Sequence, residues 1–489
     1  MKEPPDLPSP GREGPKAPPD PASTDPSRPT APPDSALPDR AGPTAPPDSA
    51  FADQHGNLQG GGDIPLGRVF PPLPTGVAWG LERTEDLLRE IGDPHRAYPS
   101  LHIGGTNGKG SGAAVWARVL LEEGRRVGLY TSPHLCSFRE RFQIGGRPVT
   151  ASTLLASADE LREPIARLGL TFFEAATVLA FHMFAREGVE VAVVEVGLGG
   201  RLDSTNVITP EVTAITNVAL DHGEYLGYTL ESIAGEKAGI IKAGVPVVTA
   251  ERDGALCEIF RARAQSLGAP FHSMNPAEEV EGLTVSAQGN TFRMETRTWG
   301  GLELRTPLPG RHQAHNTALA VRALELLPDP LRPGRDSVLK GVSGVQWPGR
   351  LQIHTQAEGT WVFDVAHNTA GVRALAASVP RLALPEPLVL LVGIQGDKDW
   401  RSMLPPLFEM AKEAVLTQPP SVPPGRRWDP LEAAGAVKAR PNLHILDDFE
   451  EALAAARKAA GKGTVLVTGS HHTVGDAMNV LGILPYGPE

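Results

Sequence analysis

The sequence predicts an α/β protein with two domains, a larger one followed by a smaller one, each built on a mostly parallel sheet. Apolar runs such as residues 189–196 are continuous rather than alternating, and segments with helical periodicity separate them. A glycine-rich loop joins one apolar run to a helix, and a proline-rich break at residues 327–337 divides two stretches with this alternation. These observations indicate parallel sheets covered by helices on both faces.

Length, charge and cysteine content exclude several classes of protein. The 489 residues are enough for two or three ordinary domains. The formal net charge of -11 argues against a nucleic-acid partner, because phosphate backbones are bound by an excess of Lys and Arg. Cys136 and Cys257 are far apart and form no metal-binding spacing. No apolar stretch has the length of a membrane span or the pattern of a signal peptide. We therefore expect a soluble, cytoplasmic monomer with no membrane partner.

Residues 1–70 are rich in Pro, Asp, Ser, Ala and Gly, and the segment PTAPPDSA occurs at residues 29–36 and again at residues 43–50. Such a composition buries too little apolar surface to offset the entropy of ordering the chain. We expect a disordered tail with polyproline II character. A docking role for its proline motifs is the alternative.

The larger domain is predicted at residues 77–330, where strands and helices alternate. Leu81, Leu87 and Ile91 lie on one stripe of its first helix, which Gly92 ends. Strands are expected at residues 98–103, 125–131, 189–196, 211–218 and 245–250, and helices at residues 111–123, 172–187, 229–244 and 308–327.

The smaller domain is predicted at residues 337–485 and repeats the alternation. Its strands are expected at residues 360–366, 387–394, 413–418, 442–446 and 464–470, with a helix at residues 448–461. Because active sites often form in the cleft between two such domains, we expect the site to involve both.

The stretch LHIGGTNGKGSG at residues 101–112 lies between a strand and a helix, where backbone N–H groups bind phosphate. Lys109 is placed to neutralise the β- and γ-phosphates. The general pattern GxxxxGK[ST] is not met, because Ile103 replaces its first glycine and Gly110 separates Lys109 from Ser111. A tight turn with a surface lysine is the alternative.

A second glycine cluster, EVGLGGRLDSTN, follows the strand at residues 189–196. Gly197, Gly199 and Gly200 suggest a dinucleotide-binding loop, but Leu202 stands where the third glycine of GxGxxG is required. A nicotinamide enzyme is therefore disfavoured.

Carboxylate and imidazole groups lie at the ends of two predicted strands that follow each other in the sequence. Glu195 ends one buried strand, and Asp221 and His222 follow the next, so these groups lie at the sheet edge where α/β folds bind ligands. Together with Ser111 they suit Mg²⁺, which prefers oxygen ligands. Two alternatives stay open, that Glu195 pairs with Arg201 and that His222 caps a helix. The residue pattern around Lys237 indicates an ordinary solvated helix with ion pairs.

Polar groups in the second half of the chain suit anions. His312, His315 and Asn316 lie in the first turn of a helix, where anions or polar ligand groups are favoured over zinc. Asp364 and His367 lie at a strand end of the smaller domain. Arg350 lies near the interdomain break, from which an arginine can reach a γ-phosphate when the domains close.

In order, HIGGTNGKGS, TSPHL, TFFEAATVLAF, VEVGLGGRLDSTN, AGEKAGIIK, WPGRLQ, FDVAHNTAG and VTGS resemble the motifs of folylpolyglutamate synthases and the related bifunctional dihydrofolate synthases. These enzymes are related to the Mur peptidoglycan ligases. The resemblance covers residues 77–480 and implies a P-loop-type ATPase domain followed by a Rossmann-like domain. Its form of the phosphate loop contains the additional glycine.

The resemblance implies ATP-dependent joining of L-glutamate to a folate, and also to 7,8-dihydropteroate in a bifunctional enzyme. The γ-phosphoryl group is transferred to the substrate carboxylate, and the glutamate amine then displaces phosphate. Because two anions must meet, cations and Mg²⁺ are needed to stabilise the transferring group. ATP, Mg²⁺, L-glutamate and a folate or dihydropteroate are thus the implied small-molecule partners.

The resemblance also assigns roles to individual residues. Lys109, Lys237 and His222 are the implied catalytic residues, and Lys237 matches a lysine that the family carbamylates to make a metal ligand. ATP contacts are implied for Gly105, Thr106, Asn107, Gly108, Lys109, Gly110, Ser111, Asn316, Arg350, Asp364 and His367. The implied metal ligands are Ser111, Glu195, His222 and Lys237. Substrate contacts are implied for Thr131, Ser132, Pro133, His134, Phe173 and Glu174.

Two departures and two alternatives accompany the resemblance. His471 and His472 follow VTGS where the family has an apolar and aromatic run, and Val365 stands where the family often has glycine. A Mur-type ligase acting on a nucleotide-sugar precursor is the first alternative, which TSPHL and GTNGKGS disfavour. The second is a non-catalytic nucleotide-binding protein, which needs the phosphate loop but not the set of Glu195, His222, Lys237 and Arg350.

Overall fold

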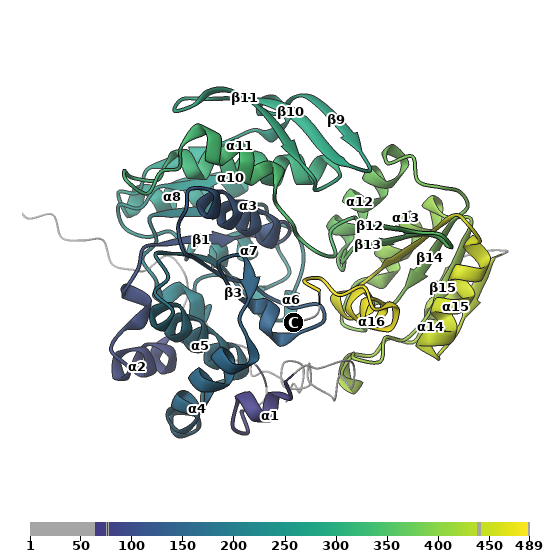
Figure 1. The fold of residues 1–489 in the computed structure, drawn as a ribbon, viewed down its shortest axis with the longest axis horizontal. Helices are drawn as coiled ribbons and strands as arrows, with labels where there is room; N and C mark the ends of the chain where they lie inside the picture. Colours follow the sequence, from purple (N-terminus) through teal and green to yellow (C-terminus); the bar gives the residue numbers. More distant parts are fainter. Residues whose placement is uncertain (1–63, 75, 77, 438–441, 488–489) are drawn as a thin grey trace, which may run out of the picture. The chain divides into compact units, whose positions relative to one another are not determined.

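Figure 1 shows a computed structural model of the chain, which describes residues 64–74, 76, 78–437 and 442–487. The predicted disordered tail lies outside the described residues up to residue 63. Within the described part, no helix combines the length and apolar character of a membrane span.

The larger sheet has eight strands in the order β4-β3-β2-β5-β1-β6-β7-β8. Six of its strands are parallel to one another: β2, β5, β1, β6, β7 and β8. Strands β3 and β4 form an antiparallel edge beside β2. The bounds are β1 Ser100–Gly104, β2 Val127–Tyr130, β3 Phe142–Ile144, β4 Arg147–Pro148, β5 Val191–Glu195, β6 Val212–Ile215, β7 Val247–Thr249 and β8 Phe271–Ser273.

Helices cover both faces of this sheet because neighbouring residues of a strand point to opposite sides. Val191 and Val193 of β5 pack in one buried cluster, and Ala192 and Val194 pack in another. The first cluster includes residues of α3 Lys109–Glu122, α10 Arg311–Glu325 and α11 Arg335–Ser343. The second includes residues of α1 Leu66–Val69, α2 Glu82–Glu90, α4 Ala151–Leu168 and α5 Phe172–Arg186, while α7 Leu230–Ala238 and α8 Gly254–Ser266 pack in a third. We call this part of the protein, with its sheets and helices, the first lobe.

A three-stranded antiparallel sheet, absent from the sequence prediction, belongs to the first lobe. It consists of β9 Glu281–Ser286, β10 Gly289–Thr296 and β11 Gly300–Thr306. Buried and exposed residues alternate along β10, and its Phe292 and Met294 pack in the cluster of α10 and α11. Figure 1 shows this sheet beside α10 and α11.

The second lobe is built on a six-stranded sheet in the order β12-β13-β17-β14-β15-β16, parallel except for β12. Its strands are β12 Gln352–Gln356, β13 Gly359–Phe363, β14 Leu388–Val392, β15 Glu413–Leu416, β16 Leu443–Ile445 and β17 Thr464–Thr468. Its helices are α12 Thr369–Ser378, α13 Trp400–Met410, α14 Pro430–Ala436, α15 Phe449–Ala460 and α16 His471–Leu481. The predicted α/β class, with a larger and a smaller parallel-rich sheet, is confirmed.

The short helices lie in connections. They are α6 Gly223–Leu226 and α9 Pro276–Glu279, and the 3-10 turns η1 Pro94–Arg96, η2 Phe138–Arg141, η3 Ser204–Val207, η4 Val379–Arg381 and η5 Pro424–Arg426.

Two boundaries differ from the sequence prediction. Residues 64–70 are not part of a disordered tail, because α1 forms there and Val69 and Phe70 are buried against α4 and α5 residues. The break at residues 327–337 is a connection within the first lobe, because Val338 and Val342 of α11 pack in the same core as α3. Proline-rich composition marked this connection but not the point where the chain leaves the lobe, which comes after α11.

Candidate active site

One cavity of about 510 Å³ collects residues from both lobes. Eighteen of the twenty predicted site residues line it, and the exceptions are Thr131 and His134. Thr131 instead borders a small adjoining cavity, and the His134 ring accepts a hydrogen bond from Arg141 (2.9 Å). The sequence therefore located the site, although the roles of its residues stay predictions.

The phosphate loop connects β1 to α3, as predicted. Gly105 and Gly108 have φ angles of 133° and 87°, which a residue with a Cβ atom rarely adopts. A Cβ at Gly108 would lie 2.4 Å from the Asn316 side chain, so glycine permits this close approach. The loop is also held by Asn217, which bonds the backbone of Asn107 through both ends of its amide (3.1 and 3.0 Å).

Two polar groups at the start of α3 face the cavity with few partners. Within the described part of the chain, Ser111 Oγ is buried and has no hydrogen-bond partner. The half-buried Lys109 Nζ has one partner there, the Thr106 carbonyl at 3.3 Å. Since buried polar groups are nearly always satisfied, the Ser111 hydroxyl indicates a ligand at this end of the helix, and Lys109 Nζ lies beside it with donors to spare. The alternative of a tight turn with a surface lysine does not fit this arrangement.

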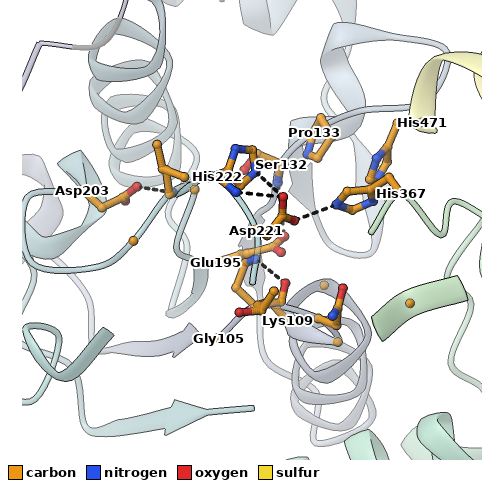
Figure 2. A pocket seen from close by; sticks show the side chains of 18 of the residues that line it. Gly105, Lys109, Ser132, Pro133, Glu195, Asp203, Asp221, His222, His367 and His471 are labelled. Carbon is orange, nitrogen blue, oxygen red and sulfur yellow. Dashed lines mark hydrogen bonds and ion pairs between the residues drawn. The ribbon is translucent and has the colours of Figure 1, made fainter. Parts of the chain in front are cut away.

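Glu195 ends β5 inside the cavity (Figure 2). Burial raises the pKa of its carboxyl, while the charge of Lys109 and the hydrogen bond from Ser132 N (3.2 Å) act in the opposite direction. It does not pair with Arg201, which binds Glu236 at 2.8 Å instead. The Glu195 carboxylate therefore has oxygen lone pairs available to bind a cation at the phosphate loop.

Asp221 is the most heavily contacted acid of the site, and Figure 2 shows it between His222 and His367. Lys398 Nζ donates to one oxygen at 2.7 Å, and Asn368 Nδ2 donates to the other at 3.0 Å. Burial raises the pKa of this carboxyl, but the contact with His367 and the charges of His222 and Lys398 outweigh burial and hold it well below its usual value. Asp221 therefore joins the first lobe to α12 and to the loop before α13.

His222 lies beside Asp221 with a φ of 53° and immediately precedes α6. Its side chain makes no capping hydrogen bond, so the helix-cap alternative applies only to its backbone. Burial and the Lys398 charge lower its pKa to about 3, which leaves a neutral ring with a lone pair for a cation.

Lys237 is buried in α7, contrary to the solvated helix that its residue pattern indicated. The glycine cluster after β5 explains this, because a Cβ at Gly200 would lie 2.7 Å from the Glu236 carbonyl. No helix starts at these glycines, which excludes the dinucleotide alternative. Among the described residues none bonds Lys237 Nζ, and burial together with the Lys109 charge lowers its pKa to about 7.

The second lobe contributes the groups predicted to contact ATP. Asp364 follows β13 and accepts hydrogen bonds from the backbone N–H groups of Leu351 (2.9 Å) and Ala366 (3.0 Å). The His367 Nδ1 atom bonds the Val365 carbonyl at 2.9 Å, which directs its other nitrogen to Asp221. In the first lobe, the Asn316 amide donates to Gln313 at 3.2 Å.

Phe173 and Glu174 of α5 belong to the region predicted to bind substrate. Phe173 lines the cavity next to Gly197, where a Cβ would lie 2.2 Å from its ring. Glu174 also lines it, but its carboxylate caps α5 at Thr171 N (2.7 Å) and pairs with Arg83 (2.8 Å). Glu174 is thus engaged in holding the helix that presents Phe173.

Sequence reasoning missed several residues of the site, among them Asn368 and the cavity-lining Lys398. Asn368 pairs with the amide of Asn107 in the phosphate loop (3.0 Å), across the two lobes. Its position after His367 at a strand end was the available signal. Lys398 lies in a charged run, Asp397 to Asp399, that is typical of a solvated turn, so nothing in the sequence marked it.

The two histidines that depart from the family pattern begin α16. His471 lies in the cavity, 5.1 Å from the His367 ring centroid, and its Nε2 is 3.4 Å from Arg350 Nη2. His472 faces away and bonds the Ser421 hydroxyl at 2.8 Å. Only His471 therefore bears on the site.

Comparisons with known proteins agree with this geometry. Residues 103–324 match the Mur ligase middle domain, and residues 349–471 match the Mur ligase glutamate ligase domain. The chain is 34% identical to folylpolyglutamate synthase of Lacticaseibacillus casei over 78% of this chain and 90% of that protein. It is 32% identical to dihydrofolate synthase/folylpolyglutamate synthase of Mycobacterium tuberculosis over 82% of this chain and 90% of that protein.

Solved structures show the same likeness. Mycobacterium tuberculosis folylpolyglutamate synthase complexed with ADP aligns with a TM-score of 0.76 at 32% identity, covering 83% of this chain and 95% of that one. E. coli FolC in complex with DHPP and ADP aligns with a TM-score of 0.74 at 30% identity, covering 83% and 94%. The chain therefore belongs to the folylpolyglutamate synthase and dihydrofolate synthase family of the Mur ligase superfamily, whose members are ATP-dependent amino-acid ligases.

Proposed function

We propose that this protein joins L-glutamate to the carboxylate of a folate at the expense of ATP, and that 7,8-dihydropteroate is a second acceptor. One observation carries the proposal: the phosphate loop of the first lobe and the cationic groups of the second line a single cavity. Two anions, a triphosphate and a carboxylate, must approach each other in such a reaction. Lys109, Arg350 and Lys398 supply the positive charge that this approach requires.

The reaction has two steps. A carboxylate oxygen of the acceptor attacks the γ-phosphorus of ATP and ADP leaves, which gives an acyl phosphate. The glutamate amine then attacks the acyl carbon, loses a proton and displaces phosphate, which leaves the amide. The loop amides and Lys109 hold the phosphates, and Arg350 neutralises the charge of the transferring group.

The donor set of the cavity fits Mg²⁺, although among the described residues no three His, Cys, Asp or Glu side chains form a metal cluster by themselves. Ser111 Oγ is an unpartnered buried oxygen, and Glu195 receives one hydrogen bond. We propose that Ser111, Glu195, His222 and Lys237 in its carbamylated form hold the ion. When bound, Mg²⁺ shields the phosphate charges and stabilises the transferring phosphoryl group.

The proposed function is tested by adding ATP, Mg²⁺ and L-glutamate to the purified protein and following ADP and phosphate release. Release is expected to depend on an acceptor, tetrahydrofolate or dihydropteroate, and to match the amide product in amount. The reaction without acceptor is the control for simple ATP hydrolysis. Acceptor-independent ADP release, or none with either acceptor, would refute the proposal.

A further inference from the structure

Residues 347–351, WPGRL, form a strap that carries Arg350 between the two lobes. At its start, the Trp347 ring packs against the core of the first lobe. At its end, Leu351 is fully buried in the core of the second. Arg350 lies between these anchors and lines the cavity. Its position is therefore set by how each end of the strap is held.

The first anchor rests on the phosphate loop. A Cβ atom at Gly110 would lie 2.8 to 3.0 Å from three atoms of the Trp347 indole, closer than real Cβ contacts come. The ring thus occupies the place that a side chain at position 110 would need. Gly110 is the residue that separates Lys109 from Ser111 and breaks the general phosphate-loop pattern.

The indole contact is one of packing. Trp347 Nε1 is buried and has no hydrogen-bond partner in the part of the chain that the structure describes. A phenyl ring in its place removes no hydrogen bond, and so isolates the contribution of the ring surface.

The second anchor is a strained backbone held by a carboxylate. Leu351 has a φ of 47°, in the left-handed region that residues with a side chain rarely adopt. Its N–H group donates to Asp364 at 2.9 Å, and Gly349 accepts from Val365 N at 3.0 Å. The residues on both sides of Arg350 are thereby fixed to β13 and the loop that follows it.

Arg350 itself has little to hold its side chain. Among the described residues it forms no ion pair within 4.0 Å, and its guanidinium forms hydrogen bonds only with the Gly349 carbonyl (3.2 Å) and His471 (3.4 Å). The anchored backbone, rather than a carboxylate partner, directs it into the cavity.

We propose that Trp347 is a positioning residue for Arg350: its indole, seated on Gly110, couples the phosphate loop to the strap, so that the guanidinium lies at a fixed distance from the bound γ-phosphate. The inference rests on the proposed function for the identity of that phosphate. It assigns a purpose to the additional glycine of the loop, which makes room for the ring.

The test uses the full chain with Trp347→Ala, Trp347→Phe, Gly110→Ala and the double variant G110A/W347A. The first measurement, by titration calorimetry with Mg²⁺, is the Kd for ADP divided by the Kd for AMPPCP, which reports the contribution of the γ-phosphate without any acceptor. The second is kcat for ligation. Because a displacement of about 1 Å costs up to about 100-fold, Trp347→Ala is expected to lower kcat about 10- to 100-fold. It is expected to lower the Kd ratio about tenfold, with the Kd for ADP nearly unchanged.

Two comparisons separate positioning from general damage. Trp347→Phe is expected to retain most of the ratio and of kcat. Trp299→Phe, in the turn between β10 and β11 and outside the cavity lining, serves as the control for a ring change elsewhere: it also removes the hydrogen bond from Nε1 to the Pro333 carbonyl (3.1 Å), yet is expected to leave the Kd ratio unchanged. In the double variant the small residue at 347 leaves room for the methyl group at 110. G110A/W347A is therefore expected to be no worse than Trp347→Ala alone.

The proposal would be overturned if the losses of the two single variants multiplied in the double variant. A Kd ratio of Trp347→Ala within about twofold of the wild-type ratio would also overturn it. If Trp347→Ala does not fold, Trp347→Leu supplies the same comparison with more apolar contact retained. If the wild-type protein binds AMPPCP more tightly than ADP but forms no amide, the proposed function is contradicted. The coupling between Trp347 and Arg350 can still be measured in that case from the Kd ratio.

Discussion

Replacing Lys237 by alanine is expected to lower kcat about 10²- to 10³-fold, the loss typical of removing one group that stabilises developing charge. The Lys237 amine is buried in the cavity, has no partner among the described residues, and has a pKa lowered to about 7 by burial and the Lys109 charge. In the proposed mechanism the neutral amine adds CO₂ and releases a proton, which would turn a cation into an anionic oxygen ligand. Bicarbonate or acetate at high concentration is expected to restore part of the lost activity.

The control for this prediction is Lys242→Ala. Lys242 follows α7, bonds the Asn206 carbonyl at 2.7 Å and does not line the cavity, so its loss is expected to leave kcat nearly unchanged. Turnover of Lys237→Ala within about threefold of wild type would remove the carbamate from the mechanism.

Replacing Asp221 by asparagine is expected to lower the free energy of unfolding by about 3 to 5 kcal/mol. It leaves the buried Lys398 ammonium with only the longer contact to Asp397 (4.0 Å), a carboxylate that Arg426 also binds (2.6 Å). The Lys398 and Asp221 side chains are both less than a tenth exposed, at 6% and 8%. Urea unfolding measures the change. The double variant D221N/K398M, which removes both charges, is expected to recover part of the loss.

The exposed pair of Arg401 and Glu432 provides the control. Its side chains are 63% and 57% exposed, so Glu432→Gln is expected to change stability by less than about 1 kcal/mol. A loss for Asp221→Asn as small as that of the control would contradict the view that the Asp221 pair holds the two lobes together.

The sequence predicted the parts of the site that local patterns mark. The phosphate loop stands between an apolar strand and a helix. Glu195 ends β5 and Asp221 follows β6, the two parallel strands on either side of β1, so parallel topology places both at the sheet edge where the loop lies. The β9 to β11 sheet was missed, although the alternating burial of β10 has a counterpart in its sequence: Phe292 and Met294 are separated by the exposed Arg293.

Other features depend on contacts between distant residues. Asn107 and Asn368 form an amide pair across 261 positions of the sequence, and Lys398 meets Asp221 across 177. No local pattern reports such contacts. The burial of Lys237 depends likewise on the glycines after β5, and only the resemblance to the family predicted its role.

The central claim is that the γ-phosphoryl group of ATP passes to the acceptor carboxylate before the amide forms. It is tested most directly with an acceptor whose reacting carboxylate carries ¹⁸O. Attack by a carboxylate oxygen on phosphorus, followed by displacement of phosphate, transfers one labelled oxygen to each phosphate released. We therefore expect ¹⁸O in the inorganic phosphate in proportion to the amide formed. Amide formation with unlabelled phosphate would contradict the account.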